Sequence, residues 1–146
     1  MISFAPATEA DFERLLALRV EAMGPHLRRL GRFDPERSRM HFREAFDPAT
    51  MRLILADGVF IGCVNLAREA DHYWLGQFYL SAAHHGRGLG TEVLMRLLAE
   101  TDAGGLPVRM RVLKQNPAVR LYERHGFSKT GEDEWDVYYE RPAASG

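Results

Sequence analysis

The sequence predicts an α+β fold in which a mixed, mainly antiparallel and twisted sheet is flanked by helices, in one domain over residues 1–146. Three observations support this prediction. Helical signals occupy residues 8–46, and residues 51–80 change to strand-like runs. A glycine-rich turn then introduces a helix and another strand, as in a crossover unit. A chain of 146 residues is long enough to bury one core and too short for two ordinary ones.

Local signals define the first elements. Residues 2–4 alternate as a short strand does, and Thr8 followed by Asp11 resembles a capping box, which opens a helix. Gly24-Pro25 should break that helix. Asp34-Pro35 supplies an N-cap and a first-turn proline for a later helix. The helical pieces are therefore expected from residue 8 to 23, on to Gly31, and from 34 to about 46.

Strands are predicted in the middle of the chain. Residues 51–55 and 59–66 read as two strands joined at Asp57-Gly58, a two-residue hairpin turn. A third strand over residues 72–80 makes three consecutive antiparallel strands. The later elements are expected as a helix ending at Gly104-Gly105, a strand over 108–112, a helix from Asn116-Pro117 to Gly126, strands over 128–133 and 135–141, and a flexible tail over 142–146.

Composition argues against several functions. The 19 basic and 20 acidic residues nearly cancel, so a nucleic-acid partner is not expected. No apolar run approaches the length that spans a bilayer and no signal peptide begins the chain, so we expect a cytoplasmic protein without a membrane partner. The lone Cys63 cannot form an internal disulfide and lies in an apolar run, which favours a buried thiol over a nucleophile. No metal site is expected.

The glycine cluster between residues 86 and 90 is a candidate anion site. It follows a strand and opens a helix, where unpaired N–H groups and the helix dipole favour a phosphate. The chain has no Gly-Lys-Ser or Gly-Lys-Thr, and the glycine spacing does not fit the dinucleotide fingerprint. A tight turn without a ligand is the alternative interpretation.

Two motifs resemble the GNAT N-acetyltransferase superfamily. His85-Gly86-Arg87-Gly88-Leu89-Gly90 is similar to its pyrophosphate loop, Arg/Gln-x-x-Gly-x-Gly/Ala, with His85 at the first position. Residues 116–127 resemble its Asn-x-x-Ala-x-x-Leu-Tyr-x-x-x-Gly-Phe segment. Asn116 stands six residues before Tyr122 where seven is common, so either Asn116 or Gln115 takes the asparagine place.

The resemblance implies an acetyl-CoA-dependent N-acetyltransferase that transfers an acetyl group directly, in a ternary complex, to an amine of a small molecule or peptide. It assigns the proton donor to Tyr122, whose alternative role is to pack a helix against the core. It is also compatible with a homodimer. The residues that the resemblance assigns to acetyl-CoA are Phe78, Tyr79, Leu80, His85, Gly86, Arg87, Gly88, Leu89, Gly90, Thr91 and Asn116.

The general base and the acceptor stay open at this stage. Candidate bases are His72 beside Asp71, Gln77 acting through a water, and the acids at 132, 133, 134 and 136, with deprotonation by solvent as the alternative. The basic segment 26–32 could attract an anionic acceptor, and Trp135 and Tyr138 could line the cleft. Two other functions remain: a non-catalytic acyl-CoA sensor and a mononucleotide-binding protein.

Overall fold

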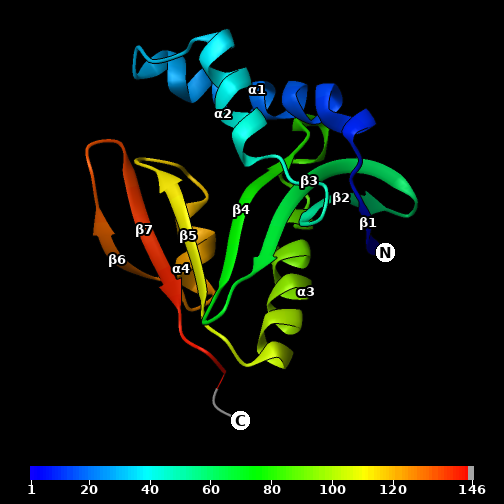
Figure 1. The fold of residues 1–146 in the computed structure, drawn as a ribbon, viewed down its shortest axis with the longest axis vertical. Helices are drawn as coiled ribbons and strands as arrows, with labels where there is room; N and C mark the ends of the chain where they lie inside the picture. The colour runs from blue at the N-terminus through cyan, green and yellow to red at the C-terminus, as the bar shows by residue number, and fades with distance from the viewer. Residues whose placement is uncertain (145–146) are drawn as a thin grey trace. The chain divides into compact units, whose positions relative to one another are not determined.

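The computed structural model describes residues 1–144, drawn as a ribbon in Figure 1. These residues form two compact units. Unit 1 contains Met1–Asn65 and Gln77–Gly90, and unit 2 contains Leu66–Gly76 and the chain from Thr91 onward. Of the tail predicted over 142–146, residues 145 and 146 lie outside the described part. None of the helices in the described part is both long and apolar enough to span a bilayer.

The elements follow the predicted order. Within residues 1–144, seven strands are hydrogen-bonded in the order β1-β2-β3-β4-β5-β7-β6. The β4–β5 pairing is parallel, whereas β1–β2, β2–β3, β5–β7 and β6–β7 are antiparallel. This confirms the predicted mixed, mainly antiparallel sheet with helices. The bounds are β1 Ile2–Pro6, α1 Phe12–Arg29, α2 Pro35–Ala45, β2 Met51–Ala56, β3 Val59–Arg68, β4 Tyr73–Leu80, α3 Leu89–Gly104, β5 Val108–Leu113, α4 Val119–Arg124, β6 Ser128–Glu132 and β7 Asp136–Arg141.

In unit 1 the short-range signals act as predicted. The backbone N–H of Thr8 donates to the Asp11 carboxylate at 2.9 Å, which completes the capping box before α1. Asp34 caps α2 by accepting from two backbone N–H groups. At the β2–β3 hairpin, Asp57 and Gly58 both adopt positive φ, 49° and 82°. Each of these signals joins residues at most three positions apart, which is why the sequence reveals them.

The core of unit 1 lies where α1 and α2 meet the sheet. Phe12 stacks on Phe42 with ring centroids 5.4 Å apart and meets Phe46 edge-on at 5.5 Å. Met51 and Cys63 contribute from β2 and β3 to the same buried cluster. This packing fixes α1, and therefore the side chains that α1 directs at β4.

The predicted break at Gly24-Pro25 is wrong, because α1 continues through Pro25 to Arg29. Gly24 lies close to Arg28 and Phe33, whose side chains would be 3.5 Å from an added Cβ. The helix ends one turn later, at Gly31 with φ 69°, where Gly31 and the next residue donate to carbonyls of the last turn. The end at Gly31 was predicted correctly, whereas the proline costs one backbone hydrogen bond without ending the helix.

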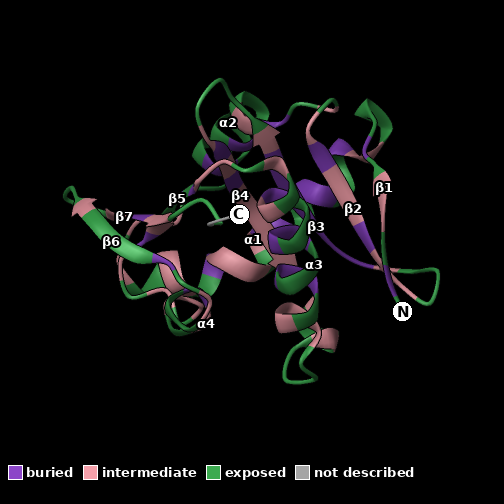
Figure 2. Cartoon of the chain, turned by 90° about the horizontal axis from the view of Figure 1, so that it is seen from below, coloured by how far each residue is buried: buried purple, intermediate pink, exposed green. Residues whose placement is uncertain are grey.

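In unit 2, α3 buries Val93, Leu94, Leu97 and Leu98, and this face is purple in Figure 2. Arg141 at the end of β7 binds Asp102 of α3 through both terminal nitrogens, at 2.6 and 3.3 Å, and donates to the His125 carbonyl at 2.8 Å. The sheet and two helices of this unit are thereby joined at one guanidinium.

The helix predicted from Asn116 to Gly126 is shorter, because α4 covers only Val119–Arg124. Gln115 adopts φ 67°, and the Asn116 side chain accepts a hydrogen bond from the Ala118 backbone at 2.8 Å. A turn therefore occupies the first predicted helical residues. Gly126, with φ 95°, closes the segment as expected.

Candidate active site

The predicted cofactor loop connects β4 to α3. Phe78, Tyr79 and Leu80 are the last residues of β4, a short 3-10 turn follows, and α3 begins at Leu89. Gly86 and Gly88 both have φ 74°, and nothing lies within 4 Å of a Cβ built on either. The backbone around them is therefore left-handed and open. N–H groups in the first turn of α3 have no carbonyl within the helix to bind.

Side chains hold this loop in place from within unit 1. The Ala82 N–H donates to the Glu21 carboxylate at 3.0 Å, and Ser81 Oγ lies 2.5 Å from His84 Nδ1. His85 Nε2 donates to the Leu80 carbonyl at 2.8 Å, so that nitrogen is occupied inside the loop. Arg87 is exposed on the same loop. The loop is thus organised by its own residues, with its glycine backbone left accessible.

Strand β4 is distorted just before the loop. Gln77 adopts φ 46° in the middle of the strand, a conformation that costs energy for a residue with a Cβ. Its side-chain oxygen accepts from Arg19 at 2.8 Å and from the Tyr79 hydroxyl at 3.1 Å. The Tyr79 hydroxyl also lies 3.0 Å from the Met23 sulfur. Two of these contacts, from Arg19 and Met23, join α1 to the distorted part of β4.

Cys63 lies beneath this point and is fully buried. Its thiol donates to the Gln77 carbonyl at 3.4 Å. Burial raises the pKa of Cys63 to about 12, and the hydrogen bond with the Tyr79 backbone and the charge of Arg19 oppose that rise only in part. Burial likewise raises the pKa of Tyr79 to about 12. Cys63 is therefore a protonated, structural thiol at neutral pH.

Tyr122 belongs to unit 2, on α4. Its side chain is buried, and its ring meets Phe127 edge-on with centroids 5.9 Å apart. The backbone carbonyl of Tyr122 accepts from both His125 and Phe127. This packing is the one expected for a tyrosine that closes a helix against the core.

Asn116 and Gln115 differ in their hydrogen bonding and backbone conformation. The Asn116 side chain binds the Ala118 N–H within the turn, whereas Gln115 is exposed and left-handed. Asn116 thus orders the approach to α4 but is not the residue that caps the helix, a place held by Ala118. Thr91 lies in the first turn of α3, partly exposed.

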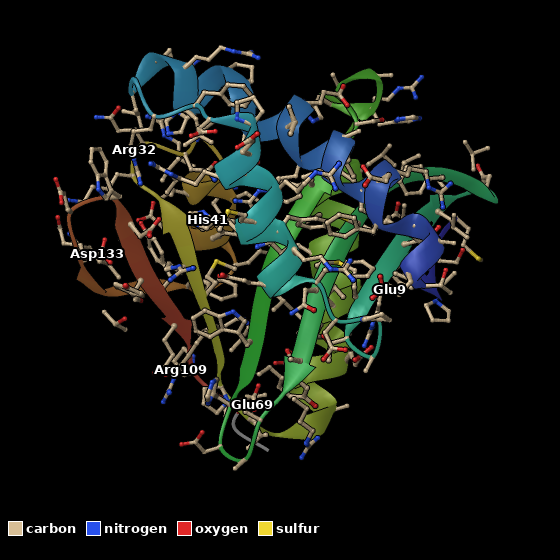
Figure 3. The ribbon with its side chains drawn as sticks, turned by 45° about the horizontal axis from the view of Figure 1, so that its top comes forward. Glu9, Arg32, His41, Glu69, Arg109 and Asp133 are labelled. Carbon is tan, nitrogen blue, oxygen red and sulfur yellow. The ribbon has the colours of Figure 1, made fainter. Side chains whose placement is uncertain are left out.

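Two of the acidic candidates for the general base, Glu132 and Asp133, are weak bases. The pKa of Glu132 is lowered to about 2, chiefly by hydrogen bonds from Lys129 and Lys114. The pKa of Asp133 is lowered to about 2 by the Tyr138 hydroxyl, which donates at 2.6 Å, and by two backbone N–H groups in the turn between β6 and β7 (Figure 3). Asp136 lies 3.8 Å from Arg111. Glu134 is exposed in the same turn.

His72 precedes β4 and is partly buried. Its Nδ1 lies 2.7 Å from the Asp71 carboxylate, and its ring meets Trp74 edge-on at 6.4 Å. The hydrogen bond from His72 lowers the pKa of Asp71. This His-Asp pair holds the ring in one orientation, as a base would require, and it lies within unit 2.

The residues expected to contact the acceptor differ in their local contacts. In the segment 26–32, Arg28 lies over the Phe33 ring at 4.4 Å and Arg29 contacts His26 at 3.0 Å. Trp135 is 37% exposed in the β6–β7 turn. Tyr138 lines a shallow hollow of about 370 Å³ on the unit 2 sheet, beside Trp74, Thr130 and the Arg109–Glu140 pair, whose Arg109 is labelled in Figure 3. Within residues 1–144 no cluster of three or more metal-ligand side chains occurs.

Arg19 is a polar residue beside β4 that belongs to neither sequence motif. It occupies a position on the apolar face of α1, between Leu16 and Met23, and it is buried. A charged residue at an apolar position is a signal that the sequence contains. Its partner Gln77 lies 58 residues away, so the pairing itself could not be found without the fold.

Comparisons with known proteins identify the family. The model for "Acetyltransferase (GNAT) family" matches residues 13–127. A search of the curated proteins found no match. The solved structure of the PaiA N-acetyltransferase from Thermoplasma acidophilum, in complex with coenzyme A, is similar with a TM-score of 0.76 and 19% identity, covering 97% of this chain and 99% of that one.

Two further structures show the same fold. The ribosomal-protein-S18-alanine N-acetyltransferase from Escherichia coli has a TM-score of 0.74 at 16% identity and covers 100% of this chain and 97% of its own. An acetyltransferase from Thermus thermophilus has a TM-score of 0.74 at 21% identity and covers 97% of both chains. The family match spans well over half of the sequence, and this protein therefore belongs to the acetyltransferase (GNAT) family.

Proposed function

We propose that this protein transfers an acetyl group from acetyl-CoA directly to an amine. The observation that carries the proposal is the β4–α3 loop, in which Gly86 and Gly88 present a left-handed, open backbone at the start of a 16-residue helix. That arrangement suits the pyrophosphate of a CoA thioester, since N–H groups and the helix dipole favour an anion there. Membership of the family supports acyl-CoA-dependent N-acetyl transfer in general.

The residues assigned to acetyl-CoA have distinct tasks. The backbone from Gly86 to Thr91 would bind the pyrophosphate, with Arg87 adding a positive charge. Backbone groups of Phe78, Tyr79 and Leu80 would face the thioester. His85 would contribute through the loop conformation, because its Nε2 is bound to the Leu80 carbonyl. Asn116 would order the turn before α4 and bind the pantetheine arm.

When bound, acetyl-CoA supplies an acetyl group activated as a thioester. In the proposed reaction the neutral amine nitrogen forms a bond to the carbonyl carbon, and the carbon–sulfur bond then breaks. Tyr122 donates its phenolic proton to the departing thiolate. Glu132 and Asp133 are too acidic to take the proton of the amine, which passes to His72 or to water. Transfer is direct because Cys63 is a buried thiol with a raised pKa.

A non-catalytic acyl-CoA sensor is the second candidate. The burial of Tyr122 against Phe127 favours it, because the same contacts serve a purely structural residue. Both functions require the glycine loop. They differ in turnover, so the deciding measurement is chemical rather than a binding assay.

The test is a screen of amines with acetyl-CoA, monitored by the release of free thiol and by the mass of the acetylated product. Peptide N-termini, polyamines, amino acids and aminosugars should be included. The proposal expects amine-dependent thiol release that disappears in a Gly88→Val variant that still folds. Tight binding of acetyl-CoA without turnover on any amine would instead support the sensor.

A further inference from the structure

Arg19 places a positive charge inside unit 1. Only 8% of the residue is exposed, and it lies on the face of α1 that packs against the sheet. Its positive charge is close enough to Cys63 and Tyr79 to oppose the rise in pKa that burial causes in both. A buried guanidinium costs free energy unless an anion or several acceptors surround it.

The residues described here satisfy that guanidinium only in part. Nη1 donates to the Gln77 side-chain oxygen at 2.8 Å, and Gln77 is neutral. Nε is buried and has no hydrogen-bond partner within residues 1–144. No carboxylate of the described chain forms an ion pair with Arg19. Glu21, two residues along α1, directs its carboxylate to the Ala82 N–H instead.

The position of the unsatisfied Nε shows which edge of the Arg19 guanidinium could bind a ligand. In a planar guanidinium, Nε–H and Nη2–H point from the same edge, whereas Nη1 lies on the other side. Gln77 occupies Nη1, which leaves the Nε–Nη2 edge for another acceptor. Two parallel N–H donors at that spacing match the two oxygens of a carboxylate in a bidentate pair.

Some of the residues around this edge are partly exposed. Gln77 and Tyr79, which contact Arg19 and each other, are both partly exposed, as is Met23 on α1. Arg19 therefore lies at the inner end of a polar cluster that reaches solvent. The cluster is on the same strand, β4, as the residues Phe78, Tyr79 and Leu80 assigned above to the thioester.

We propose that Arg19 binds the carboxylate of the acetyl acceptor, so that the acceptor is a small molecule bearing both an amine and a carboxylate, of the amino-acid class. This proposal rests on the proposed acetyl transfer, because it places the acceptor beside the thioester strand. A free carboxylate supplies the planar pair of oxygens and the negative charge that Arg19 lacks. An amide in its place would supply one acceptor oxygen and no charge.

A purely structural role for Arg19 makes a different prediction. In that case the guanidinium would only hold Gln77 in its left-handed conformation, and its loss would affect every ligand equally. The carboxylate role requires a preference between two ligands that differ in one group. The experiment therefore compares matched pairs of ligands.

The probes are the N-acetyl derivatives of the twenty amino acids and the corresponding N-acetyl amides, titrated calorimetrically into protein saturated with CoA. We expect the parent protein to bind at least one acid more tightly than its amide. Arg19→Met should weaken the binding of that acid by about 30-fold or more, as expected when one partner of a buried charge pair is removed. The affinity for the amide should change little. Arg19→Lys keeps the positive charge but lacks the two parallel N–H donors of a guanidinium, so it should lose most of the preference for the acid over its amide.

Arg14→Met is the matched control, since Arg14 lies on the same helix but is exposed and paired with Asp11. Each variant is first checked for its melting temperature and its affinity for CoA. Equal binding of acid and amide by the parent across the panel would overturn the proposal, as would an acid preference that survives in both Arg19 variants. Stronger binding of N-acetyl aminoalkyl phosphates than of the acids would overturn it too.

The outcome separates this proposal from the proposed function. Arg19-dependent preference for the acids without acetylation of any amine would support the carboxylate site and reject acetyl transfer. Acetylation of amines that lack a carboxylate, at rates unaffected in Arg19→Met, would support acetyl transfer and reject the role of Arg19.

Discussion

The imidazole of His85 donates from Nε2 to the carbonyl of Leu80 at 2.8 Å, and this bond ties the cofactor loop to the last residue of β4. A side chain that resembled a direct pyrophosphate ligand in the sequence thus has a donor already in use. The remaining ring nitrogen and the loop conformation are what His85 can offer to a ligand.

We therefore expect His85→Ala to weaken CoA binding by about 3- to 10-fold, the range for loss of one ordinary hydrogen bond. The melting temperature should change little, because His85 is exposed. Calorimetric titration with CoA measures this effect. His41→Ala, which removes an exposed histidine from α2, serves as the control and should bind CoA as the parent does. A loss of binding far above 10-fold would point to direct contact between His85 and the pyrophosphate.

Gly88→Ala should reduce both stability and cofactor affinity. An alanine at φ 74° costs about 1–2 kcal/mol of conformational energy. Gly31 is a matched control, because it has φ 69° and equally open surroundings but lies outside the loop. Gly31→Ala should show the same loss of stability in denaturant unfolding with unchanged CoA affinity. If both alanine variants bind CoA as tightly as the parent, the loop is not the pyrophosphate site.

Tyr122→Phe keeps the ring that packs on Phe127 and deletes only the hydroxyl. If Tyr122 is the proton donor, turnover should fall by about 10²-fold, the low end for general acid catalysis, while the Kd for acetyl-CoA changes much less. The measurement requires both substrates at saturation with chemistry as the slow step. Parental turnover under those conditions would mean that solvent protonates the thiolate. A lower melting temperature with normal turnover would assign Tyr122 to packing alone.

Cys63 should carry no acetyl group at any stage of the reaction. Its pKa of about 12 keeps the thiol protonated at neutral pH, and it donates to the Gln77 carbonyl. Intact-mass measurement after acetyl-CoA is mixed with the protein should show no covalent adduct. Cys63→Ala should lose about 1 kcal/mol of stability from the small cavity and retain turnover. Detection of an acetyl group on Cys63 would replace direct transfer with a two-step route.

The hairpin acids give a prediction about pH. The folded pKa of Glu132, about 2, lies below its ordinary value, so ion pairing with Lys114 and Lys129 stabilises the fold above the ordinary pKa and is lost as pH falls towards 2. The stability difference between the parent and Glu132→Gln should be constant at neutral pH and shrink on acidification. Urea unfolding across this range measures it.

The same acids should not shape the pH dependence of catalysis. Glu132→Gln and Asp133→Asn should keep the parental pH profile of kcat/KM around neutrality, since both carboxylates ionise far below that range. Glu44→Gln on α2 is the control for a change of surface charge. The disappearance of one limb of the profile in either hairpin variant would identify that residue as the base.

Sequence reasoning succeeded where the determinant is local. The Thr8–Asp11 capping box, the Asp34 cap and the Asp57-Gly58 turn are each set by residues within three positions of one another, and all were predicted. The break predicted at Pro25 was wrong because packing and the Gly31 cap outweigh one missing hydrogen bond in α1.

In the candidate site, too, only features set by neighbouring residues could be predicted. Gly86 and Gly88 could be singled out because the motif is contiguous. The Arg19–Gln77 contact joins residues 58 positions apart, and the positive φ of Gln77 belongs to the folded strand, so neither is visible in the sequence. Likewise, the low pKa of Glu132 depends on Lys114 from another element.

The division of the chain between the two units has a consequence for biosynthesis. Each unit is built from two separate stretches, so unit 1 lacks the segment Gln77–Gly90 until that part of the chain has left the ribosome. A nascent chain ending near Asn65 holds Arg19 and Cys63 without the strand that carries Gln77. The loop that is assigned to the cofactor is therefore also the segment whose synthesis completes the first unit, and a translational pause before it would leave Arg19 and Cys63 without their contacts to Gln77.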